Sequence, residues 1–372
     1  MNEEFVPVSH ITPEQSKHLQ GIAILMMLFM HLFQKDYHGL FEPLVFFPNG
    51  VPLYYYIGLF CDACVPIFAF VSGYGLYFKF TRDRAGYAKS NRKRLLKLYL
   101  TLWIIILLIP VGLGLLMQQE SYPGSWTKVL SNLLALDWNS YSGAWWFFTT
   151  YVLFVLTSSF WFRLVEKLRW WILLPAMLAV YVAGFGLRIY MPNLFGIPML
   201  DYLQRISANF LCTLPQFLLG TLALKYDWTG WFQKVYRAVT DRQTDRQTDR
   251  QELRHDWFAD LLLIGGVAVM MVIHYIVPNF IIAPFTGLGF IFLFLLVKPL
   301  GAVRAFLDFF AGHSTNTWLT HMLFYSTFFS AFVYSTGYVL TVFATLLLLC
   351  ILSSYLIQFI HKPIFSSLTK SL

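Results

Sequence analysis

Long apolar segments recur along the whole chain, and short polar stretches separate them. Ten of these segments can be drawn as membrane-spanning helices, over residues 18–34, 54–78, 96–117, 145–163, 170–190, 206–225, 258–277, 280–297, 313–335 and 338–360. A helix of about 20 apolar residues crosses the roughly 30 Å of hydrocarbon in a bilayer, and it satisfies its own backbone hydrogen bonds there. The pattern predicts an all-α integral membrane protein, a bundle of about ten transmembrane helices that form a single membrane domain over residues 1–372.

The pair of segments at 258–277 and 280–297 is the weakest part of this assignment. Only Pro278 and Asn279 separate the two segments, which leaves room for a tight turn. A re-entrant hairpin would also fit this part of the sequence.

The composition supports a membrane protein. Hydrophobic residues make up 58% of the 372 residues and charged residues 12%, against roughly 45–50% and about 25% in soluble proteins. The N-terminus is polar and partly acidic and shows no cleavage site after the first apolar run, so we expect that run to remain as a helix.

The cationic residues predict the orientation in the membrane. With the N-terminus in the cytoplasm, all but four of the 27 Lys and Arg residues fall on the cytoplasmic side; the four are Lys35, Lys128, Arg188 and Arg205. Such a bias follows the positive-inside rule and predicts that both termini are cytoplasmic. The net charge of +8 is then a signal of topology, and it requires no nucleic-acid partner.

Residues 226–257 are predicted to form a cytoplasmic polar loop. Within this loop, Thr240 to Gln251 reads Thr-Asp-Arg-Gln three times over. Alternating charge without an apolar residue cannot bury a face, so the repeats predict a solvated loop or a short polar helix with no chemistry of its own.

The same repeats predict a feature of the gene. The codons ACA GAC AGA CAG encode Thr-Asp-Arg-Gln and consist of the tetranucleotide ACAG three times, so slippage by one unit would shift the reading frame and switch the protein off. We expect the DNA to carry an uninterrupted ACAG tract. Mixed synonymous codons across the three repeats would contradict this expectation.

The four cysteines indicate packing rather than chemistry. Cys61 and Cys64 form a CxxC within an apolar segment, and no second pair completes a zinc site, while Cys212 and Cys350 stand alone. We therefore expect neither a disulfide framework nor a metal site.

The first apolar segment contains an ionisable residue, His31. Such residues are costly to place in a membrane and are often functional, although a buried histidine bonded to a neighbouring helix would also fit. Gln20 stands eleven residues earlier, and eleven steps of about 100° return to the same helix face, roughly 16 Å away along the axis. One face of this helix thus carries a polar group near the cytoplasmic end and an imidazole deeper in the membrane.

The second apolar segment ends in small residues and leads into a basic stretch. Ser72, Gly73 and Gly75 let helices pack closely or let a ligand approach the backbone. The following segment, Lys79 to Lys97, contains eight cations. They either anchor the helices at anionic head groups or bind a polyphosphate ligand, and Arg has the forked geometry that phosphate prefers.

Two further polar clusters are candidates for substrate binding. The outer loop at 118–144 contains Asp137 and leads into Trp145 and Trp146; such aromatic residues are typical of membrane interfaces but also suit a sugar. Near the start of the ninth segment, polar side chains gather at the cytoplasmic end: His313, Ser314, Asn316, Trp318 and His321. We expect His274, near the outer end of the seventh segment, to be interfacial.

In combination, several segments resemble acyltransferase family 3, whose bacterial members use acyl-CoA to O-acetylate cell-surface glycans. The matching pieces, in order, are LQGIAILMMLFMH at 19–31, VPIFAFVSGYGLY at 65–77, RKRLLKLY at 92–99, WWFFTTYVLF at 145–154 and HSTNTWLTH at 313–321. Each piece is degenerate, and their ordered combination carries the resemblance.

The resemblance implies that His31 is the catalytic histidine and that a basic residue stands eleven positions before it. This chain has Gln20 there instead, so Lys17, Arg92 or Arg94 is expected to supply the cation. The resemblance also implies a multi-pass protein of the bacterial cytoplasmic membrane that takes acetyl-CoA as co-substrate and binds no permanent cofactor.

These expectations give a concrete mechanism. Acyl transfer from a thioester to a hydroxyl needs a base of near-neutral pKa, and histidine is the usual choice. His31 would act on the hydroxyl of the glycan or lipid-linked sugar directly or through an acyl-enzyme, while Arg92, Arg94, Lys97, Gln20 and Ser72 would hold acyl-CoA. His321 would assist catalysis, and Trp145, Trp146, Asp137 and Asn316 would bind the acceptor.

Two other classes of function remain open at this point. A transporter or flippase for a lipid-linked sugar would use its intramembrane histidines to relay protons or bind substrate, although inverted repeats and broken helices are not evident in the sequence. A sensing or binding membrane protein without turnover is the third class.

Overall fold

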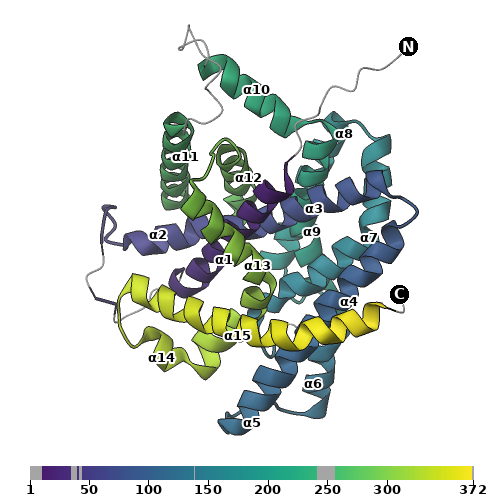
Figure 1. Ribbon diagram of the computed structural model, residues 1–372, viewed down its shortest axis with the longest axis vertical. Coiled ribbons are helices and arrows are strands. Elements are labelled where there is room, and N and C mark those ends of the chain that lie inside the picture. The colour runs from purple at the N-terminus through teal and green to yellow at the C-terminus, as the bar shows by residue number, and fades with distance from the viewer. Residues whose placement is uncertain (1–10, 35–39, 42–43, 138, 241–255, 371–372) are drawn as a thin grey trace.

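The protein folds as a bundle of helices around the first one. The structure, a computed structural model, describes residues 11–34, 40–41, 44–137, 139–240 and 256–370 (Figure 1). The elements are α1 (Pro13–Phe33), α2 (Leu53–Phe60), η1 (Cys61–Ala63), α3 (Cys64–Arg82), α4 (Tyr87–Ile106), η2 (Leu107–Leu113), α5 (Gly114–Leu116), α6 (Trp126–Leu133), η3 (Gly143–Trp145), α7 (Trp146–Lys167), α8 (Trp170–Ile189), α9 (Pro198–Lys225), α10 (Trp228–Thr240), α11 (Trp257–Ile276), η6 (Phe280–Ile282), α12 (Ala283–Phe294), α13 (Gly301–Leu323), η7 (Phe324–Phe328), α14 (Ser330–Tyr334) and α15 (Val339–Thr369). Within the described residues the protein is helical and contains no strand, which confirms the predicted all-α class.

Eight of the helical segments are long and apolar enough to span a membrane. The other two predicted spans have shorter or more polar counterparts. Residues Phe280–Phe294 form η6 and α12, which at 1.5 Å per residue are only about 22 Å long. The ninth predicted span falls on α13, which is too polar to meet the same criteria.

The helix α13 differs most from its predicted bounds. It begins at Gly301 rather than at 313, and its first turns carry Arg304 and Asp308. A membrane span predicted from hydropathy excludes such charged turns. In the structure they are helical because Arg304 pairs with Glu14 of α1 at 3.1 Å and Asp308 lies 3.7 Å from His18. Residues 313–321 consequently lie in the second half of the helix, not at its start.

The local sequence explains where α1 begins. Thr12 caps the helix by accepting a hydrogen bond from the backbone of Gln15, whose side chain accepts one in return from Thr12, and Pro13 occupies the first helical position. The chain thereby enters the bundle as a helix at a defined residue.

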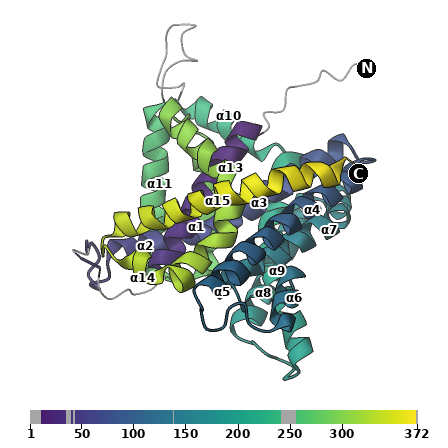
Figure 2. The same ribbon diagram turned by 60° about the horizontal axis from the view of Figure 1, so that its bottom comes forward.

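The helix α1 lies at the centre of the bundle, between α3 and α13, and α15 crosses in front of it (Figures 1 and 2). The first turns of α1 and the last turns of α15 line one common cavity. The two ends of the described chain therefore lie on the same side of the molecule.

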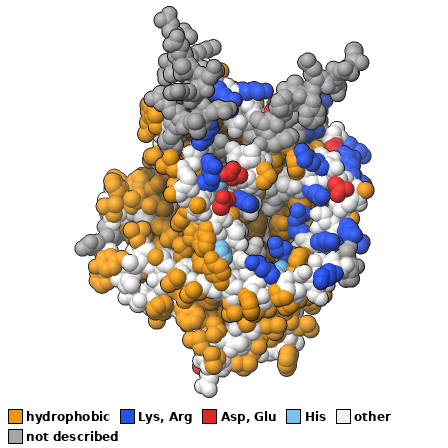
Figure 3. All heavy atoms as spheres, viewed as in Figure 1, with side chains coloured by type: hydrophobic (Ala, Val, Ile, Leu, Met, Phe, Trp, Pro, Cys, Tyr) orange, Lys and Arg blue, Asp and Glu red, His pale blue; other side chains and the backbone are white. Residues whose placement is uncertain are grey.

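The surface separates into apolar and basic regions. In Figure 3, Lys and Arg side chains gather on one side of the viewed face around a hollow, and apolar side chains cover much of the remainder. Large hydrophobic side chains stay exposed along α8, α11 and α15, including Leu178, Ile264 and Phe359. Such an apolar exterior is expected of helices that face lipid.

The predicted polar loop at 226–257 contains a helix in its first half. The helix α10 packs through Phe232 against Phe292, with ring centroids 5.3 Å apart, and the hydroxyl of Tyr236 donates to Asp256 at 2.7 Å. Of the Thr-Asp-Arg-Gln repeats, all but the first residue lie outside the described residues.

The cysteines lie where packing predicts. All four are buried with free thiols; Cys61 is the first residue of the 3₁₀ turn η1 that joins α2 to α3, and Cys64 is the first residue of α3. Among the residues that the structure describes, no group of three or more His, Cys, Asp or Glu side chains could hold a metal ion.

Small residues allow α3 and α9 to cross at very short range. A Cβ atom on Gly73 would lie 1.8 Å from the carbonyl oxygen of Phe217, and one on Gly220 would lie 2.0 Å from that of Phe70. The packing role of the small residues in the second apolar segment thus belongs to Gly73.

This contact predicts a difference between two Gly→Ala substitutions. Gly73→Ala forces backbone apart in a packed crossing, which costs about 1–3 kcal/mol, so we expect a lower midpoint of thermal unfolding in detergent. Gly186→Ala on α8 is the matched control, because a Cβ there meets no atom within 4 Å. Equal midpoints for the two variants would contradict the packing role.

Candidate active site

Two histidines from opposite ends of the chain meet inside the bundle. His31 lies in the last turn of α1 and His321 in the last turn of α13. His321 Nε2 lies 2.9 Å from His31 Nδ1, and the ring centroids are 4.8 Å apart. His321 is fully buried, whereas the ring of His31 lines a cavity.

The hydrogen bonds determine which nitrogen atoms carry protons when both rings are neutral. His321 Nδ1 faces the carbonyl oxygens of Trp318 and Thr317 at 2.8 and 3.2 Å. Carbonyls only accept, so His321 Nδ1 carries a hydrogen and Nε2 carries the lone pair. His31 must then donate from Nδ1, which leaves the lone pair of His31 on Nε2. This tautomer makes Nε2 of His31 the basic atom of the pair.

Close packing of α1 on α13 brings the two rings together. A Cβ atom on Gly21 would lie 2.3 Å from the carbonyl oxygen of Leu307. The two backbones therefore touch in the first half of each helix, whereas the histidines lie in the last turns. Reciprocal indole bonds fix α13 from the other side: Trp145 donates to the carbonyl of Leu319 at 2.9 Å, and Trp318 donates to that of Ala144 at 3.1 Å.

A cavity of about 540 Å³ opens beside the start of α1. The face of α1 that carries Gln20 lines this cavity, and so does Ser72 from α3. Three cations line it, Arg94 and Lys97 from α4 and Lys362 from α15, and Asn316 lines it from α13. Its volume lies in the range of sites for small molecules and cofactors.

Most of the residues predicted to hold a donor lie in this cavity. Gln20, Ser72, Arg94 and Lys97 line it, whereas Arg92 is exposed and is not among its lining residues. Lys17 is exposed as well, so the cations nearest to Gln20 within the cavity come from α4 and α15.

The sequence reasoning missed two residues at this cavity, His361 and Lys362. Their signal was present in the sequence: both follow the apolar run of the last helix, on the side predicted to be cytoplasmic, and precede Pro363. Only the fold shows that α15 brings them beside α4, where His361 Nε2 lies 3.3 Å from the carbonyl of Lys97.

A second cavity of about 240 Å³ lies at the other end of α1. His31 lines it, and so does Trp146 at the start of α7. Further polar side chains reach it from η1, α8 and α9, namely Asp62, Arg188, Thr213 and Gln216.

The two cavities share three lining residues, Met27, Phe147 and Trp318. Met27 stands seven residues after Gln20 and four before His31, on the helix face that the sequence predicted to carry both groups. The cavities therefore meet end to end along one face of α1.

Two other predicted binding residues lie outside both cavities. Trp145 is buried and bonded to α13 as described above, and Asp137 accepts backbone hydrogen bonds from Asn139 and Ser140 at 3.3 and 3.2 Å. The structure thus places Asp137 in a turn and Trp145 at a helix contact.

The outer loop is packed largely on itself. The rings of Tyr122 and Tyr141 stack with centroids 5.4 Å apart, and Lys128 lies 4.9 Å from each centroid. Burial raises the pKa of the Tyr141 phenol to about 12. Trp126 is 87% exposed, as expected of an aromatic residue at a membrane interface.

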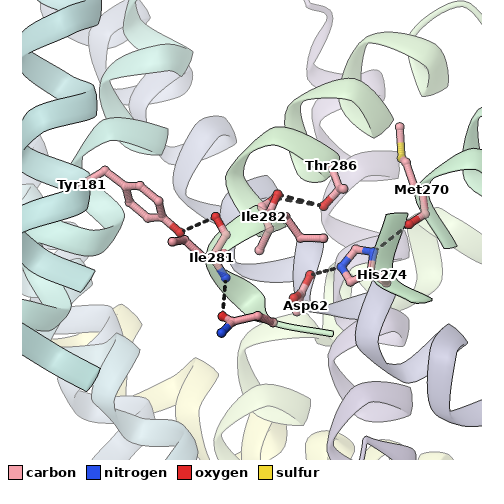
Figure 4. A network of polar contacts seen from close by, with 9 residues as sticks. Asp62, Tyr181, Met270, His274, Ile281, Ile282 and Thr286 are labelled. Carbon is pink, nitrogen blue, oxygen red and sulfur yellow. Dashed lines mark hydrogen bonds and ion pairs between the residues drawn. The ribbon is translucent and has the colours of Figure 1, made fainter. Parts of the chain in front are cut away.

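The structure places His274, which was expected to be interfacial, inside the protein. His274 is fully buried; its Nδ1 lies 2.8 Å from the carbonyl of Met270, and its Nε2 lies 3.5 Å from Asp62 Oδ1 (Figure 4). The position in sequence indicated the membrane boundary, but it did not show that Phe60 of α2 and Asp62 of η1 lie against the ring of His274. Asp62 was missed, although a carboxylate within an apolar span deserves the same functional hypothesis as His31.

Arg188 was expected among the few outer cations. The structure places it on the wall of the smaller cavity, with its guanidinium 4.9 Å from the Trp146 ring centroid and 5.5 Å from that of Phe280. Its position in the last turn of α8, directly after an apolar run, was the only signal in the sequence.

The chain matches a known protein family. The profile of a family described as Acyltransferase domain matches residues 16–358, nearly the whole chain. No curated protein and no solved structure matches. The matched region contains both histidines and the meeting point of the two cavities, and the chain belongs to acyltransferase family 3.

Proposed function

We propose that this protein transfers an acyl group, preferentially acetyl, from acyl-CoA in the cytoplasm to a hydroxyl of a cell-surface or exported glycan. One observation carries the proposal: two cavities enter the bundle from opposite ends of α1, meet at Met27, Phe147 and Trp318, and place His31 on the wall of the smaller one. An enzyme that joins substrates from two sides of a membrane needs such an arrangement.

The larger cavity suits the donor. Arg94, Lys97 and Lys362 offer three cations to the phosphates of CoA, and charge-assisted hydrogen bonds to phosphate are the stronger kind. These residues lie on the side that the positive-inside rule places in the cytoplasm. The pantetheine arm would then extend along α1 past Gln20 and Ser72 toward the shared residues.

The smaller cavity suits the acceptor. Trp146 offers an aromatic face to a sugar ring, and Gln216 offers a carboxamide to its hydroxyl groups. The cavity is smaller than a typical site for a whole ligand of drug size, so it holds one end of the glycan while the remainder stays outside.

The chemistry follows from the tautomers. Nε2 of His31 takes the proton of the acceptor hydroxyl as its oxygen attacks the thioester carbonyl. The carbon–sulfur bond breaks, and the proton on His31 passes to the departing thiolate, which leaves as CoA thiol. His321 holds Nδ1–H of His31 and thereby keeps Nε2 basic and aimed into the cavity. His321 is a positioning residue in this mechanism.

Substitution of either histidine should lower kcat and leave the KM for acetyl-CoA nearly unchanged. His31→Ala should lower kcat of transfer from labelled acetyl-CoA by at least about 100-fold, which is the usual contribution of a general base. His321→Ala should cause a loss on the order of 100-fold because the ring of His31 loses its orientation. The KM for acetyl-CoA should change little, since neither histidine lines the donor cavity.

Two variants control this experiment. His321→Gln should keep more activity than His321→Ala, because its amide oxygen can accept from His31. His313→Ala also removes an imidazole from α13. Nδ1 of His313 lies 2.8 Å from the hydroxyl of Ser354 and not beside His31, so activity should persist in this variant. Full turnover in His31→Ala would disprove the base. Transport of a lipid-linked sugar without acyl-CoA turnover would favour a transporter.

The cations predict a second contrast. Arg94→Gln and Lys97→Gln should each raise the KM for acetyl-CoA about tenfold, because each removes a charge that contacts the cavity. Arg92→Gln on the same helix is the matched control, since Arg92 is exposed outside the cavity and should change KM little. The KM for acetyl-CoA is measured for all three variants at fixed ionic strength. Equal changes of KM in the three variants would mean that the donor binds outside this cavity.

A further inference from the structure

The smaller cavity is lined by one permanent charge, Arg188, that pairs with no carboxylate among the residues that the structure describes. Arg188 stays protonated at all relevant pH values. Its guanidinium contacts the rings of Trp146 and Phe280 and the thiol of Cys212, but it forms no ion pair with any carboxylate that the structure describes. Aromatic faces compensate a cation only in part.

Asp62 lines the same cavity but does not supply the missing charge. Its carboxylate faces His274 Nε2, and His274 Nδ1 donates to the carbonyl of Met270. Among the described residues, the ion-pair partner of Asp62 is thus His274 and not Arg188. The guanidinium of Arg188 therefore has no carboxylate partner among the described residues that line the cavity.

The wall also presents hydrogen-bond acceptors toward the cavity. Gln216 is buried and lines the cavity, and its Oε1 has no hydrogen-bond partner among the described residues. A buried carboxamide oxygen without a partner costs free energy unless a ligand satisfies it. Hydroxyl groups of a sugar are suitable donors.

We infer that the acceptor carries an anionic group, a carboxylate or a phosphate, that pairs with Arg188 while its hydroxyl groups bond to Gln216. The inference rests on the proposed function and adds the class of acceptor: an acidic sugar or a sugar phosphate rather than a neutral glycan. An unpaired charge in a cavity with low dielectric is costly, and an ion pair with good geometry offsets that cost. The forked guanidinium matches both anions.

Binding of small sugars to the purified full chain tests this inference. The probes are two matched pairs: 4-nitrophenyl β-D-glucuronide against 4-nitrophenyl β-D-glucoside, and glucose 6-phosphate against glucose. We expect at least one anionic probe to bind about ten- to a hundredfold more tightly than its neutral partner, as for a hydrogen bond to a charged group. The pair that shows the preference identifies the anion as carboxylate or phosphate.

Substitutions of Arg188 test whether this residue causes the preference for anionic probes. Arg188→Met should abolish it, and Arg188→Lys, which keeps the charge but not the fork, should retain part of it. Arg205→Met is the control, because Arg205 is a nearby cation on α9 that bonds Asn193 at 2.9 Å outside the cavity. Equal binding of charged and neutral probes to the wild type, or a preference that survives in Arg188→Met, would overturn the inference.

This measurement is independent of turnover. If acetyl-CoA is not consumed but the preference depends on Arg188, the proposed reaction fails and the anion site stands. If acetyl-CoA is consumed and both probe pairs bind equally, the reaction stands and the anion site fails. A preference for succinyl-CoA over acetyl-CoA, without a preference among the sugars, would place the anion on the acyl group and also overturn the inference.

Discussion

The site depends on the hydrogen bond between His31 and His321. Residues separated by nearly the whole chain can keep two ring nitrogens 2.9 Å apart only if their helices are fixed relative to each other. Gly21 permits α1 to touch the backbone of α13, and the indoles of Trp145 and Trp318 tie α13 to the start of α7. The small residue and the two tryptophans thus hold the helices that carry the two rings, and the carbonyl of Trp318 accepts the hydrogen bond that sets the tautomer of His321.

Much of the site could be predicted from the sequence because helical periodicity is strong in apolar segments. The face shared by Gln20 and His31 follows from their spacing alone, and the two cavities along that face agree with it. The segment with Ser72 and the basic helix with Arg94 likewise reach the larger cavity. These residues lie on long regular helices, where position in sequence determines position in space.

The remaining residues depend on contacts between helices, which hydropathy does not encode. His274 follows an apolar run and was assigned to the membrane boundary, yet Asp62 from η1 pairs with it inside the protein. The start of α13 was placed too late because its charged first turns find partners on α1. Arg188 was counted as a helix-end charge on the outer side for the same reason: a sequence shows that a cation ends a helix, but not which cavity it faces.

The three residues shared by the cavities have an electrical consequence. A bilayer normally insulates across about 30 Å of hydrocarbon, but water entering both cavities would bring the two solutions close to each other at Met27, Phe147 and Trp318. Most of the membrane voltage would then fall across this thin region. Moving one elementary charge through 100 mV is worth about 2.3 kcal/mol, so the proton that His31 gains and loses lies close to where the field is steepest. The energised state of the cell would thus act directly on the reacting atoms.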